Sequence, residues 1–288
     1  MGKILITGAS GLIGSEFRAR LSADEAYFAG HRDCDVTSLE NIMTYAGDKD
    51  ISVIINCAAS RDAEYLEDNP ESGLAINVQA PKNLAVAANK LGAALIHISS
   101  DYVFDGSRNT PYRETDQVGA LSVYGRQKIE GDKAVLEIAE TAVVLRTAWV
   151  FSSYGKDFVK IIGRLAQSRD EINVIYDQVG SPAYAADFAA AVLCMLPRIK
   201  TGSREIYNLT NEGVCSWYDM AVQIVDLFGY DCRVNPIETK DFSQRAPRPK
   251  YSVLSKDKIK RDFGLSLRHY SAGLRDCVNL IKGAPNAS

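Results

Sequence analysis

The stretch KILITGASGLIG (residues 3–14) places a short apolar strand directly before a glycine loop and the start of a helix. Its glycines follow the spacing G-x-x-G-x-x-G, one residue longer than the G-x-G-x-x-G fingerprint of dinucleotide-binding folds. Glycine lets the backbone approach a pyrophosphate closely, and a helix N-terminus offers free N–H groups to it. A plain strand-to-helix turn is the alternative. The stretch predicts a dinucleotide site at Gly8, Ser10, Gly11, Leu12, Ile13 and Gly14.

The composition is that of an ordinary globular chain, with 288 residues, 46% of them hydrophobic and 24% charged. A formal net charge of −3 gives no sign of a nucleic-acid or membrane partner. The six cysteines include no C-x-x-C and the three histidines lie far apart, so we predict no metal site. Since the chain starts directly with a strand and has no leader-like segment, we expect a cytoplasmic protein.

Apolar strand patterns alternate with amphipathic helix patterns through the first half of the chain. The expected strands are 3–7, 26–29, 52–57, 94–98 and 142–146, and the expected helices are 12–21, 39–46, 70–91 and 122–140. This alternation predicts an α/β fold of the Rossmann type, a doubly wound parallel sheet with both faces covered. Ligands of such sheets bind at the carboxyl ends of the strands.

The second half shows a looser pattern. We expect helices at 158–166, 187–196, 217–228, 256–263 and 270–281, and strands at 172–176, 205–209 and 233–237. We therefore predict a Rossmann domain over 1–150, with parts of 170–200 completing its sheet. The remainder, 151–288, is expected to form mainly a smaller, discontinuous α/β lobe that binds substrate.

The end of the second strand bears on the choice of cofactor. It reads FAGHRDCDVT, so His31 and Arg32 stand where an acid would hold the ribose 2′-hydroxyl of NAD. A basic residue there favours the 2′-phosphate of NADPH; a solvated loop, with NADH as the cofactor, is the alternative. We expect Arg32, Asp35 and Val36 to contact the adenosine part of the cofactor. The small residues after the third strand, Cys57, Ala58 and Ala59, are expected to lie against it.

The stretch HISSDYVFDG (residues 97–106) ends a buried strand in two hydroxyls, and VYGRQK (residues 123–128) starts a helix. Tyr124 and Lys128 are four residues apart and therefore share a helix face. A lysine ammonium near a phenol lowers the tyrosine pKa, so that the phenol can exchange a proton with a carbonyl or alcohol. We expect Ser100 to hold the carbonyl oxygen beside Tyr124, with Ser99 as the rival serine.

Several motifs in order along nearly the whole chain resemble an extended short-chain dehydrogenase/reductase, more narrowly the dTDP-4-dehydrorhamnose reductase family. They are DVTSLENI, VIINCAA, AINVQAPKNLA, HISSDYVFDG, VYGRQKIEGD, LRTAWVF, DQVGSPAYAADFA, IYNLTNEG and RPKYSVL. The resemblance implies that Tyr124 is the proton donor, that Lys128 binds the nicotinamide ribose, and that Ser100 takes the place of the family's Thr or Ser. It also implies a substrate site that includes Ser100, Asp101, Tyr102, Val103, Tyr124, Trp149 and Arg248.

Other family positions are matched less closely. Asn77 falls on a helix asparagine with a structural or proton-relay role. Asp157-Phe158 stands where the family has N-F, Pro182-Ala183 where it has P-T, and the loop SRDAEYLED (60–68) replaces T-A-V-D-K-A-E. These departures border the sugar-nucleotide side, so they leave the identity of the sugar open.

The resemblance implies NADPH-dependent reduction of the 4-keto group of a nucleotide-linked deoxysugar, dTDP-4-dehydrorhamnose to dTDP-L-rhamnose in the first instance. Reduction, epimerisation or dehydration of another nucleotide sugar is the second hypothesis. The third is a non-catalytic NADP-binding regulatory subunit similar to that of methionine adenosyltransferase, although the complete Ser-Tyr-Lys set favours catalysis. A homodimer is compatible with all three.

Overall fold

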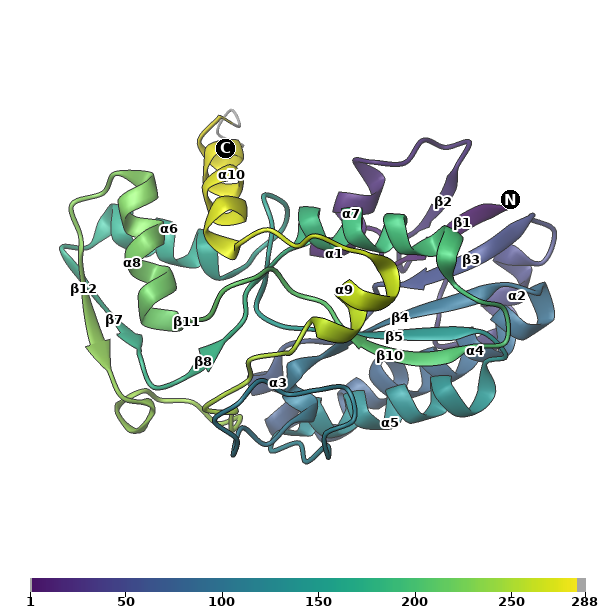
Figure 1. The fold of residues 1–288 in the computed structure, drawn as a ribbon, viewed down its shortest axis with the longest axis horizontal. Helices are drawn as coiled ribbons and strands as arrows, with labels where there is room; N and C mark the ends of the chain where they lie inside the picture. The colour runs from purple at the N-terminus through teal and green to yellow at the C-terminus, as the bar shows by residue number, and fades with distance from the viewer. Residues whose placement is uncertain (1, 284–288) are drawn as a thin grey trace.

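The computed structural model describes residues 2–283 and consists of a larger lobe around a parallel sheet and a smaller lobe beside it (Figure 1). All neighbouring strands of the six-stranded sheet run parallel. In spatial order the strands are β10 (Arg204–Asn208), β5 (Ala142–Thr147), β4 (Ala94–Ser100), β3 (Ile51–Asn56), β1 (Lys3–Thr7) and β2 (Ala26–Ala29). The Rossmann-type architecture expected from the sequence is therefore confirmed.

The central strands are apolar because helices cover both faces of the sheet. All six residues of β5 are buried, as are five of the six in β3. One face packs against α2 (Leu39–Ala46), α4 (Ala80–Leu91) and α5 (Val123–Ile138). The other face packs against α1 (Leu12–Arg18), α7 (Ala185–Met195) and α9 (Asp257–Phe263). Side chains from these two layers form the two large hydrophobic cores of this lobe.

The smaller lobe has its own core, formed by α6 (Phe158–Ser168), α8 (Trp217–Phe228) and α10 (Tyr270–Gly283) together with short strand pairs. These pairs join segments that are far apart in the sequence. They are β7 (Glu171–Ile175) with β12 (Arg233–Ile237), β8 (Val179–Gly180) with β11 (Cys215–Ser216), and β6 (Val150–Phe151) with β9 (Ala183–Tyr184). Figure 1 shows β7 and β12 at the end of the molecule away from the sheet.

One expectation about the sheet is wrong. The strand that completes it is β10, residues 204–208, which lies outside 170–200. Within 170–200, β7 pairs with β12 in the smaller lobe, while α7 packs against α1 on the sheet. The chain after β5 thus contributes to both lobes in turn.

The expected single helix over 70–91 is interrupted. A 3₁₀ turn, η1 (Pro70–Gly73), and a π-helical turn, η2 (Ala75–Gln79), precede α4. Pro81 has no N–H to donate to the Asn77 carbonyl, so a regular α-helical turn cannot form there. The remaining short elements are α3 (Ala63–Asp68), η3 (Asp101–Val103), η4 (Leu196–Arg198) and η5 (Thr239–Asp241). Among the helices of residues 2–283, none is long and apolar enough to cross a membrane.

Candidate active site

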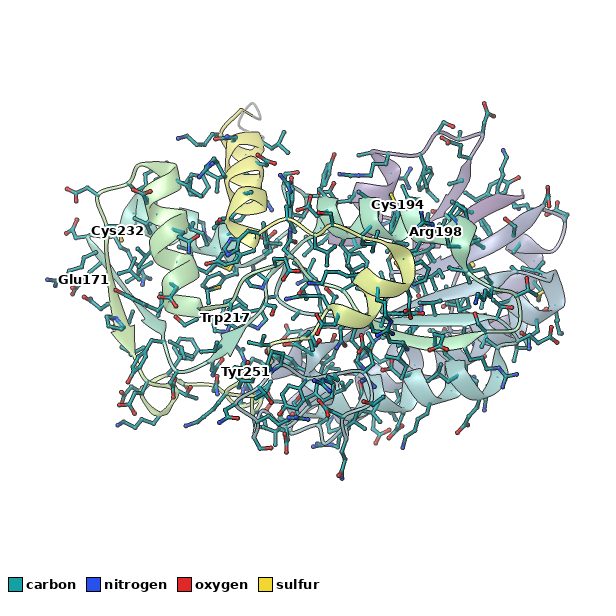
Figure 2. The ribbon with its side chains drawn as sticks, viewed as in Figure 1. Glu171, Cys194, Arg198, Trp217, Cys232 and Tyr251 are labelled. Carbon is teal, nitrogen blue, oxygen red and sulfur yellow. The ribbon has the colours of Figure 1, made fainter. Side chains whose placement is uncertain are left out.

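A cleft of about 440 Å³ opens at the carboxyl edge of the sheet, where the two lobes meet. Residues from the glycine loop, from the ends of β3 and β4, from α5 and from the smaller lobe line it. Figure 2 shows Trp217 between the lobes, on the small-lobe side. The structure brings to this cleft Gly11, Leu12, Ile13, Cys57, Ala59, Ser100, Asp101, Tyr102, Tyr124, Lys128, Trp149 and Arg248, all expected from the sequence.

The glycine loop is shaped by close backbone contacts. Gly8 has a φ of +62°, and a Cβ on it would lie 2.6 Å from the Ala58 nitrogen. A Cβ on Gly14 would lie 2.3 Å from the Gly8 carbonyl oxygen. Both positions therefore require glycine, because a side chain would push the loop away from β3 or from α1. The resulting cradle fits a pyrophosphate held at backbone distance.

The end of β2 presents a basic residue, as expected, but its acids are engaged locally. Arg32 is exposed, and Val36 is buried. The Asp33 carboxylate accepts a bond from the Gly30 N–H (2.8 Å). Asp35 accepts bonds from the N–H and hydroxyl of Thr37, which lower its pKa. The Asp35 side chain is thus part of a turn, whereas Arg32 is exposed to solvent.

Tyr124 and Ser100 lie together in the cleft. Burial raises the pKa of Tyr124 to about 12; the Ser100 hydroxyl and Arg61 act against this rise, and Asp101 adds to it. The pKa of Tyr124 is therefore raised, whereas the sequence predicted that Lys128 would lower it. Lys128 Nζ donates to the Ile98 carbonyl (2.8 Å) and lies 3.2 Å from His97 Nε2. The phenol therefore keeps its proton at neutral pH.

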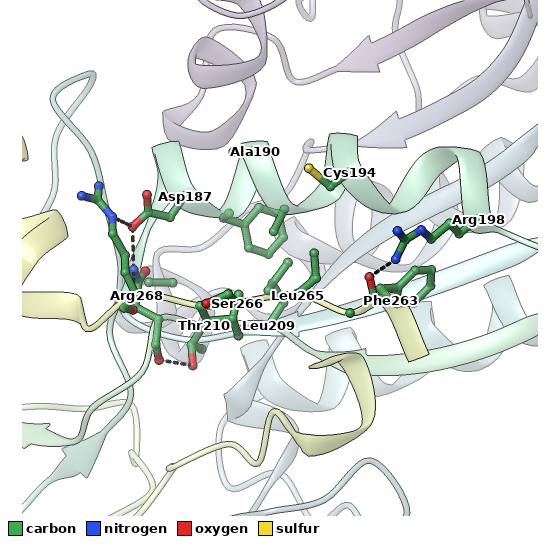
Figure 3. A pocket seen from close by; sticks show the side chains of 16 residues that line it. Asp187, Ala190, Cys194, Arg198, Leu209, Thr210, Phe263, Leu265, Ser266 and Arg268 are labelled. Atoms are coloured by element: carbon green, nitrogen blue, oxygen red, sulfur yellow. Dashed lines mark hydrogen bonds and ion pairs between the residues drawn. The ribbon is translucent and has the colours of Figure 1, made fainter. Parts of the chain in front are cut away.

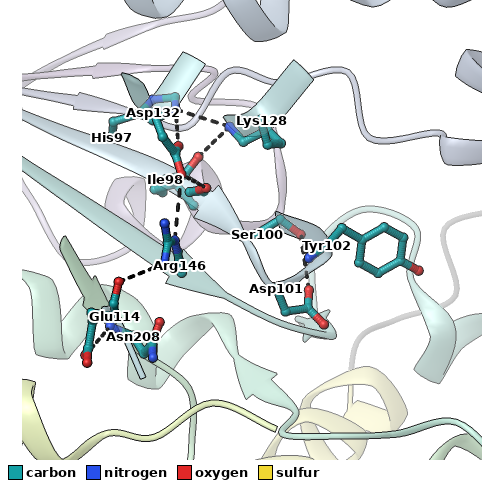
Figure 4. A network of polar contacts seen from close by, with 11 residues as sticks. His97, Ile98, Ser100, Asp101, Tyr102, Glu114, Lys128, Asp132, Arg146 and Asn208 are labelled. Atoms are coloured by element: carbon teal, nitrogen blue, oxygen red, sulfur yellow. Dashed lines mark hydrogen bonds and ion pairs between the residues drawn. The ribbon is translucent and has the colours of Figure 1, made fainter. Parts of the chain in front are cut away.

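Lys128 belongs to a buried polar cluster that also includes His97, Asp132 and Arg146 (Figure 4). Burial lowers the pKa of Lys128 to about 8, against the influence of Asp132. Sequence analysis missed His97 and Asp132. Their positions offered a signal, because Asp132 lies one helical turn after Lys128 on the same face, and His97 shares a strand face with Ser99.

The two serines at the end of β4 have different surroundings. Ser99 donates to Asp132 Oδ2 (2.7 Å), so its hydroxyl is held inside the buried cluster. The Ser100 hydroxyl donates to Asp101 Oδ1 (3.1 Å) and accepts from the Tyr102 N–H. Ser100 is the serine associated with Tyr124, as expected.

In the segment after Ser100, some side chains line the cleft and others are buried in the core. Tyr102 packs edge-to-face against Tyr124, with ring centroids 5.6 Å apart. Burial raises the pKa of Asp101 to about 6. Val103 is fully buried in a core cluster with Phe104 and does not line the cleft, so the expectation that it binds substrate is wrong. The 3₁₀ turn η3 directs its side chain inward.

Two tryptophans form the small-lobe wall of the cleft. Trp149 stacks on Trp217 with ring centroids 3.5 Å apart and an interplanar angle of 6°. The backbone of Trp149 has a φ of +48°, an uncommon conformation for a bulky residue. A Cβ on Gly180 would lie 2.6 Å from the Trp149 ring, so that glycine makes room for the stack. Trp217, the first residue of α8, was not predicted as a site residue.

Charged side chains bridge the mouth of the cleft. Arg248 donates to Glu64 Oε1 (3.0 Å), and the second oxygen of Glu64 accepts from the Arg245 N–H. Arg61 donates to the Lys156 carbonyl (2.9 Å). These contacts join α3 and the loop before it to the segments around 156 and 245–248. Arg61 and Arg248 thus place two cations at the cleft.

Asn77, which matches a family position, and Asp157, which departs from one, both make hydrogen bonds that hold loops in place. Asn77 donates to the Ser60 carbonyl (2.9 Å) and to Gln127 Oε1 (3.0 Å), and accepts from the Ser60 N–H. It therefore fixes the loop after β3 to α5. Asp157 caps α6 by accepting from the Lys160 N–H and also accepts from the Ser152 N–H (2.9 Å).

A second hollow, of about 460 Å³, lies between α7 and the segment before α10 (Figure 3). Asp187 and Arg268 form an ion pair at one end (2.7 Å), and Arg198 bonds the Phe263 carbonyl at the other. Apolar side chains such as Phe188, Leu209 and Leu265 line the space between. The residues expected to act in catalysis or binding do not line it. Within residues 2–283, no cluster of three or more His, Cys, Asp or Glu residues could hold a metal ion.

The parallel sheet, the glycine cradle and the Ser-Tyr-Lys set at its carboxyl edge define an extended short-chain dehydrogenase/reductase. The family model described as the RmlD substrate binding domain matches residues 2–282, and the chain belongs to this family.

Relatives match over nearly the full chain. A dTDP-4-dehydrorhamnose reductase of Mycolicibacterium smegmatis is 39% identical over 98% of this chain and 86% of its own length. A crystal structure of a dTDP-4-dehydrorhamnose reductase from Clostridium acetobutylicum has a TM-score of 0.92 and 36% identity, covering 97% of this chain and 99% of its own. One from Bacillus anthracis, in complex with NADP, has a TM-score of 0.91 and 31% identity, covering 96% and 98%.

Proposed function

We propose that this protein uses NADPH to reduce the 4-keto group of a nucleotide-linked deoxysugar, namely dTDP-4-dehydrorhamnose to dTDP-L-rhamnose. The observation that carries the proposal is the presence of Ser100, Tyr124 and Lys128 in one cleft next to the glycine cradle. Full-length relatives with the corresponding name support the choice of substrate.

Gly8 and Gly14 keep the loop packed against Ala58 and against its own backbone, and Gly11, Leu12 and Ile13 of this loop line the cleft, where the cofactor's pyrophosphate would lie. Arg32, exposed after β2 next to His31, is a cation suited to a 2′-phosphate, which favours NADPH over NADH. The bound cofactor supplies the hydride. Lys128, buried beside the end of β4, is placed to hold the nicotinamide ribose, and Cys57 and Ala59 line the same side of the cleft.

Tyr124 acts as the proton donor to the substrate oxygen. Its raised pKa keeps the phenol protonated at neutral pH, which is the state that a reduction requires. Ser100 donates a hydrogen bond that holds the same oxygen. The Ser100 hydroxyl donates to Asp101 Oδ1 (3.1 Å) and must rotate away from it to make this bond. A protonated Lys128 stabilises the phenolate that forms when Tyr124 gives up its proton.

The smaller lobe and the loops at the cleft mouth hold the nucleotide sugar. The flat stack of Trp149 on Trp217 offers an aromatic wall to a sugar or base. Arg248 and Arg61 supply positive charge for the diphosphate. Arg248 also pairs with Glu64 through Nη2, so this carboxylate competes with the diphosphate for the same guanidinium.

The decisive experiment is NADPH oxidation with dTDP-4-dehydrorhamnose, repeated with NADH and with a panel of other nucleotide 4-ketosugars. We expect the highest kcat/KM with dTDP-4-dehydrorhamnose and NADPH. A higher kcat/KM with another ketosugar would show that this ketosugar is the substrate. No oxidation with any of them would favour the regulatory-subunit alternative.

Two further expectations accompany this function. A cytoplasmic location would supply both NADPH and nucleotide sugars. A homodimer is compatible with this function, and light scattering on the purified protein measures the oligomeric state directly.

A further inference from the structure

His97 is a buried histidine for which the proposed chemistry has no role. It lies in β4, fully buried, with Nε2 3.2 Å from Lys128 Nζ and 3.6 Å from Asp132 Oδ1. Its other ring nitrogen, Nδ1, lies 3.0 Å from Asn56 Nδ2. The two nitrogens thus face different partners. The position of the ring proton determines whether Nε2 offers Lys128 a hydrogen-bond donor or an acceptor.

The orientation of Asn56 is set by its oxygen. Asn56 Oδ1 accepts from the Thr7 hydroxyl (2.9 Å) and from the Ala58 N–H (3.1 Å), so the amide nitrogen is the atom that faces His97. An amide nitrogen donates and does not accept. The Nδ1 of His97 therefore accepts this bond and carries no proton. In the neutral ring the proton is on Nε2.

This tautomer determines the surroundings of Lys128. The Nε2–H is directed toward Lys128 Nζ at 3.2 Å, and Asp132 Oδ1 lies 3.6 Å from Nε2, beyond hydrogen-bond distance. A neutral amine can accept from Nε2–H while it donates to the Ile98 carbonyl (2.8 Å). An ammonium cannot accept, so its N–H groups would oppose the N–H of the ring.

We propose that His97, held by Asn56 as the Nε2–H tautomer, is a positioning residue that fixes the amine of Lys128 beside the Ile98 carbonyl and favours its neutral form before the cofactor binds. The inference rests on the role proposed above for Lys128. His97 acts through the lysine and does not itself touch the cleft.

Other ionisable groups also surround Lys128. Asp132 and Tyr124 are on the same helix, Arg146 faces Asp132 from β5, and Cys57 and Asp101 line the cleft nearby. Burial lowers the pKa of Lys128 to about 8, with Asp132 acting against it. Burial, and then the charge of Lys128, lowers the pKa of His97 well below its ordinary value. Of this pair, the lysine is therefore the group that titrates near neutral pH.

The first test is the tautomer itself, measured by NMR on protein with ¹⁵N-labelled histidine. The chain has three histidines, and His31 and His269 are exposed, so H31Q and H269Q assign the remaining signals. We expect His97 to show an unprotonated Nδ1, a protonated Nε2 and no titration at its ordinary pKa of 6.5, because burial and Lys128 lower its pKa well below that value. A proton on Nδ1, or a ring that titrates at its ordinary pKa, would overturn the proposal.

The second test reverses the tautomer. Asn56→Asp keeps the oxygen that accepts from Thr7 and Ala58 but replaces the donor toward His97 by an acceptor. The ring proton then moves to Nδ1, and the free Nε2 lone pair accepts from the Lys128 ammonium. We expect the alkaline limb of the kcat/KM profile for ketosugar reduction to move up by about one pH unit.

Thr7→Val is the matched control, because it removes a bond to the same amide oxygen and leaves the donor to His97 in place. Its alkaline limb should stay where the wild-type limb is. An N56D variant whose ring has changed tautomer but whose alkaline limb has not moved would refute the role of His97. If N56D does not fold, the tautomer of the wild-type protein decides the question.

The failure of this inference can be told apart from the failure of the proposed function. The NMR measurement needs no substrate, and a ¹⁵N-lysine titration of the cofactor-free protein reports Lys128 directly. A protein that reduces no ketosugar but shows the expected tautomer and a lysine that titrates near pH 8 would refute the reductase assignment and retain the His97–Lys128 pairing.

Discussion

At the glycine loop the backbone shapes the cleft, whereas on the small-lobe side aromatic side chains shape it. Gly8 and Gly14 are required because a Cβ at either would meet main-chain atoms. Trp149 and Trp217 instead form a wall with their stacked rings. A surface made by backbone accepts few substitutions, while a surface made by side chains can change with the ligand. We therefore expect substitutions in the glycine loop to disrupt cofactor binding, and substitutions in the tryptophan wall to change which sugar is bound.

The largest effect on turnover should come from Tyr124, which lies between the glycine loop and the tryptophan wall. Tyr124→Phe removes the proton donor, and we expect kcat to fall by about 10²–10⁴-fold while NADPH affinity is kept. Turnover and cofactor titration measure the two quantities separately. Tyr176→Phe, at an exposed tyrosine of the small lobe, is the control that should leave both unchanged. An active Tyr124→Phe enzyme would refute the assignment.

The backbone-made surface can be tested with two glycines of nearly equal φ. Gly8→Ala combines a φ of +62° with a collision against Ala58, so it should lower the free energy of unfolding by more than about 2 kcal/mol and weaken NADPH binding. Gly92→Ala has a φ of +63° and open space around it, so it should cost about 1 kcal/mol and leave NADPH affinity unchanged. Chemical denaturation and fluorescence titration measure both, and equal effects of the two variants would contradict the cradle.

Asp101, at the cleft, should make stability depend on pH. Its carboxyl holds a proton more tightly in the folded chain, with a pKa of about 6, than in the unfolded chain, where it has the ordinary value of 3.8. The folded state therefore loses stability as pH rises through this window, by about 2–3 kcal/mol in total. Asp101→Asn should remove this loss, so the variant gains on the wild type between about pH 4 and pH 7 in denaturant unfolding. Asp48→Asn, at an exposed carboxylate, should show no such gain.

The smallest effect should come from the side-chain-made surface. Trp217→Leu removes the partner of Trp149, and we expect the KM for the ketosugar nucleotide to rise about tenfold, equivalent to about 1.4 kcal/mol, with NADPH affinity unchanged. Val222→Ala, on the exposed face of the same helix, is the control. If Trp217→Leu weakened NADPH binding instead, the tryptophan wall would belong to the cofactor site and not to the sugar site.

The sequence was informative where one element suffices to determine a feature. The continuous apolar runs of β3 and β5 indicate buried parallel strands, and the glycine spacing indicates the cradle, because neither needs knowledge of a distant partner. The expected residues Ser100, Tyr124 and Lys128 meet in one cleft for the same reason, since each follows or faces the end of a strand.

The sequence was less informative where contacts with a residue or strand far away in the chain determine the position of an element. The runs of β7 and β10 look alike, yet β7 pairs with β12 and β10 joins the sheet. Val103 follows the cleft residues in sequence, but a 3₁₀ turn sends its side chain into the core. His97 acquires its place through Asn56 and Lys128, which belong to two other elements.

The late position of β10 in the chain has a consequence for dissection of the molecule. Residues 1–150 expressed alone would lack the strand that covers β5, and would expose the N–H and C=O groups of that strand to other chains. Such a fragment should aggregate instead of folding as an autonomous half. The two lobes are therefore to be expressed and studied together, and a new sugar pocket requires the redesign of segments on both sides of β10.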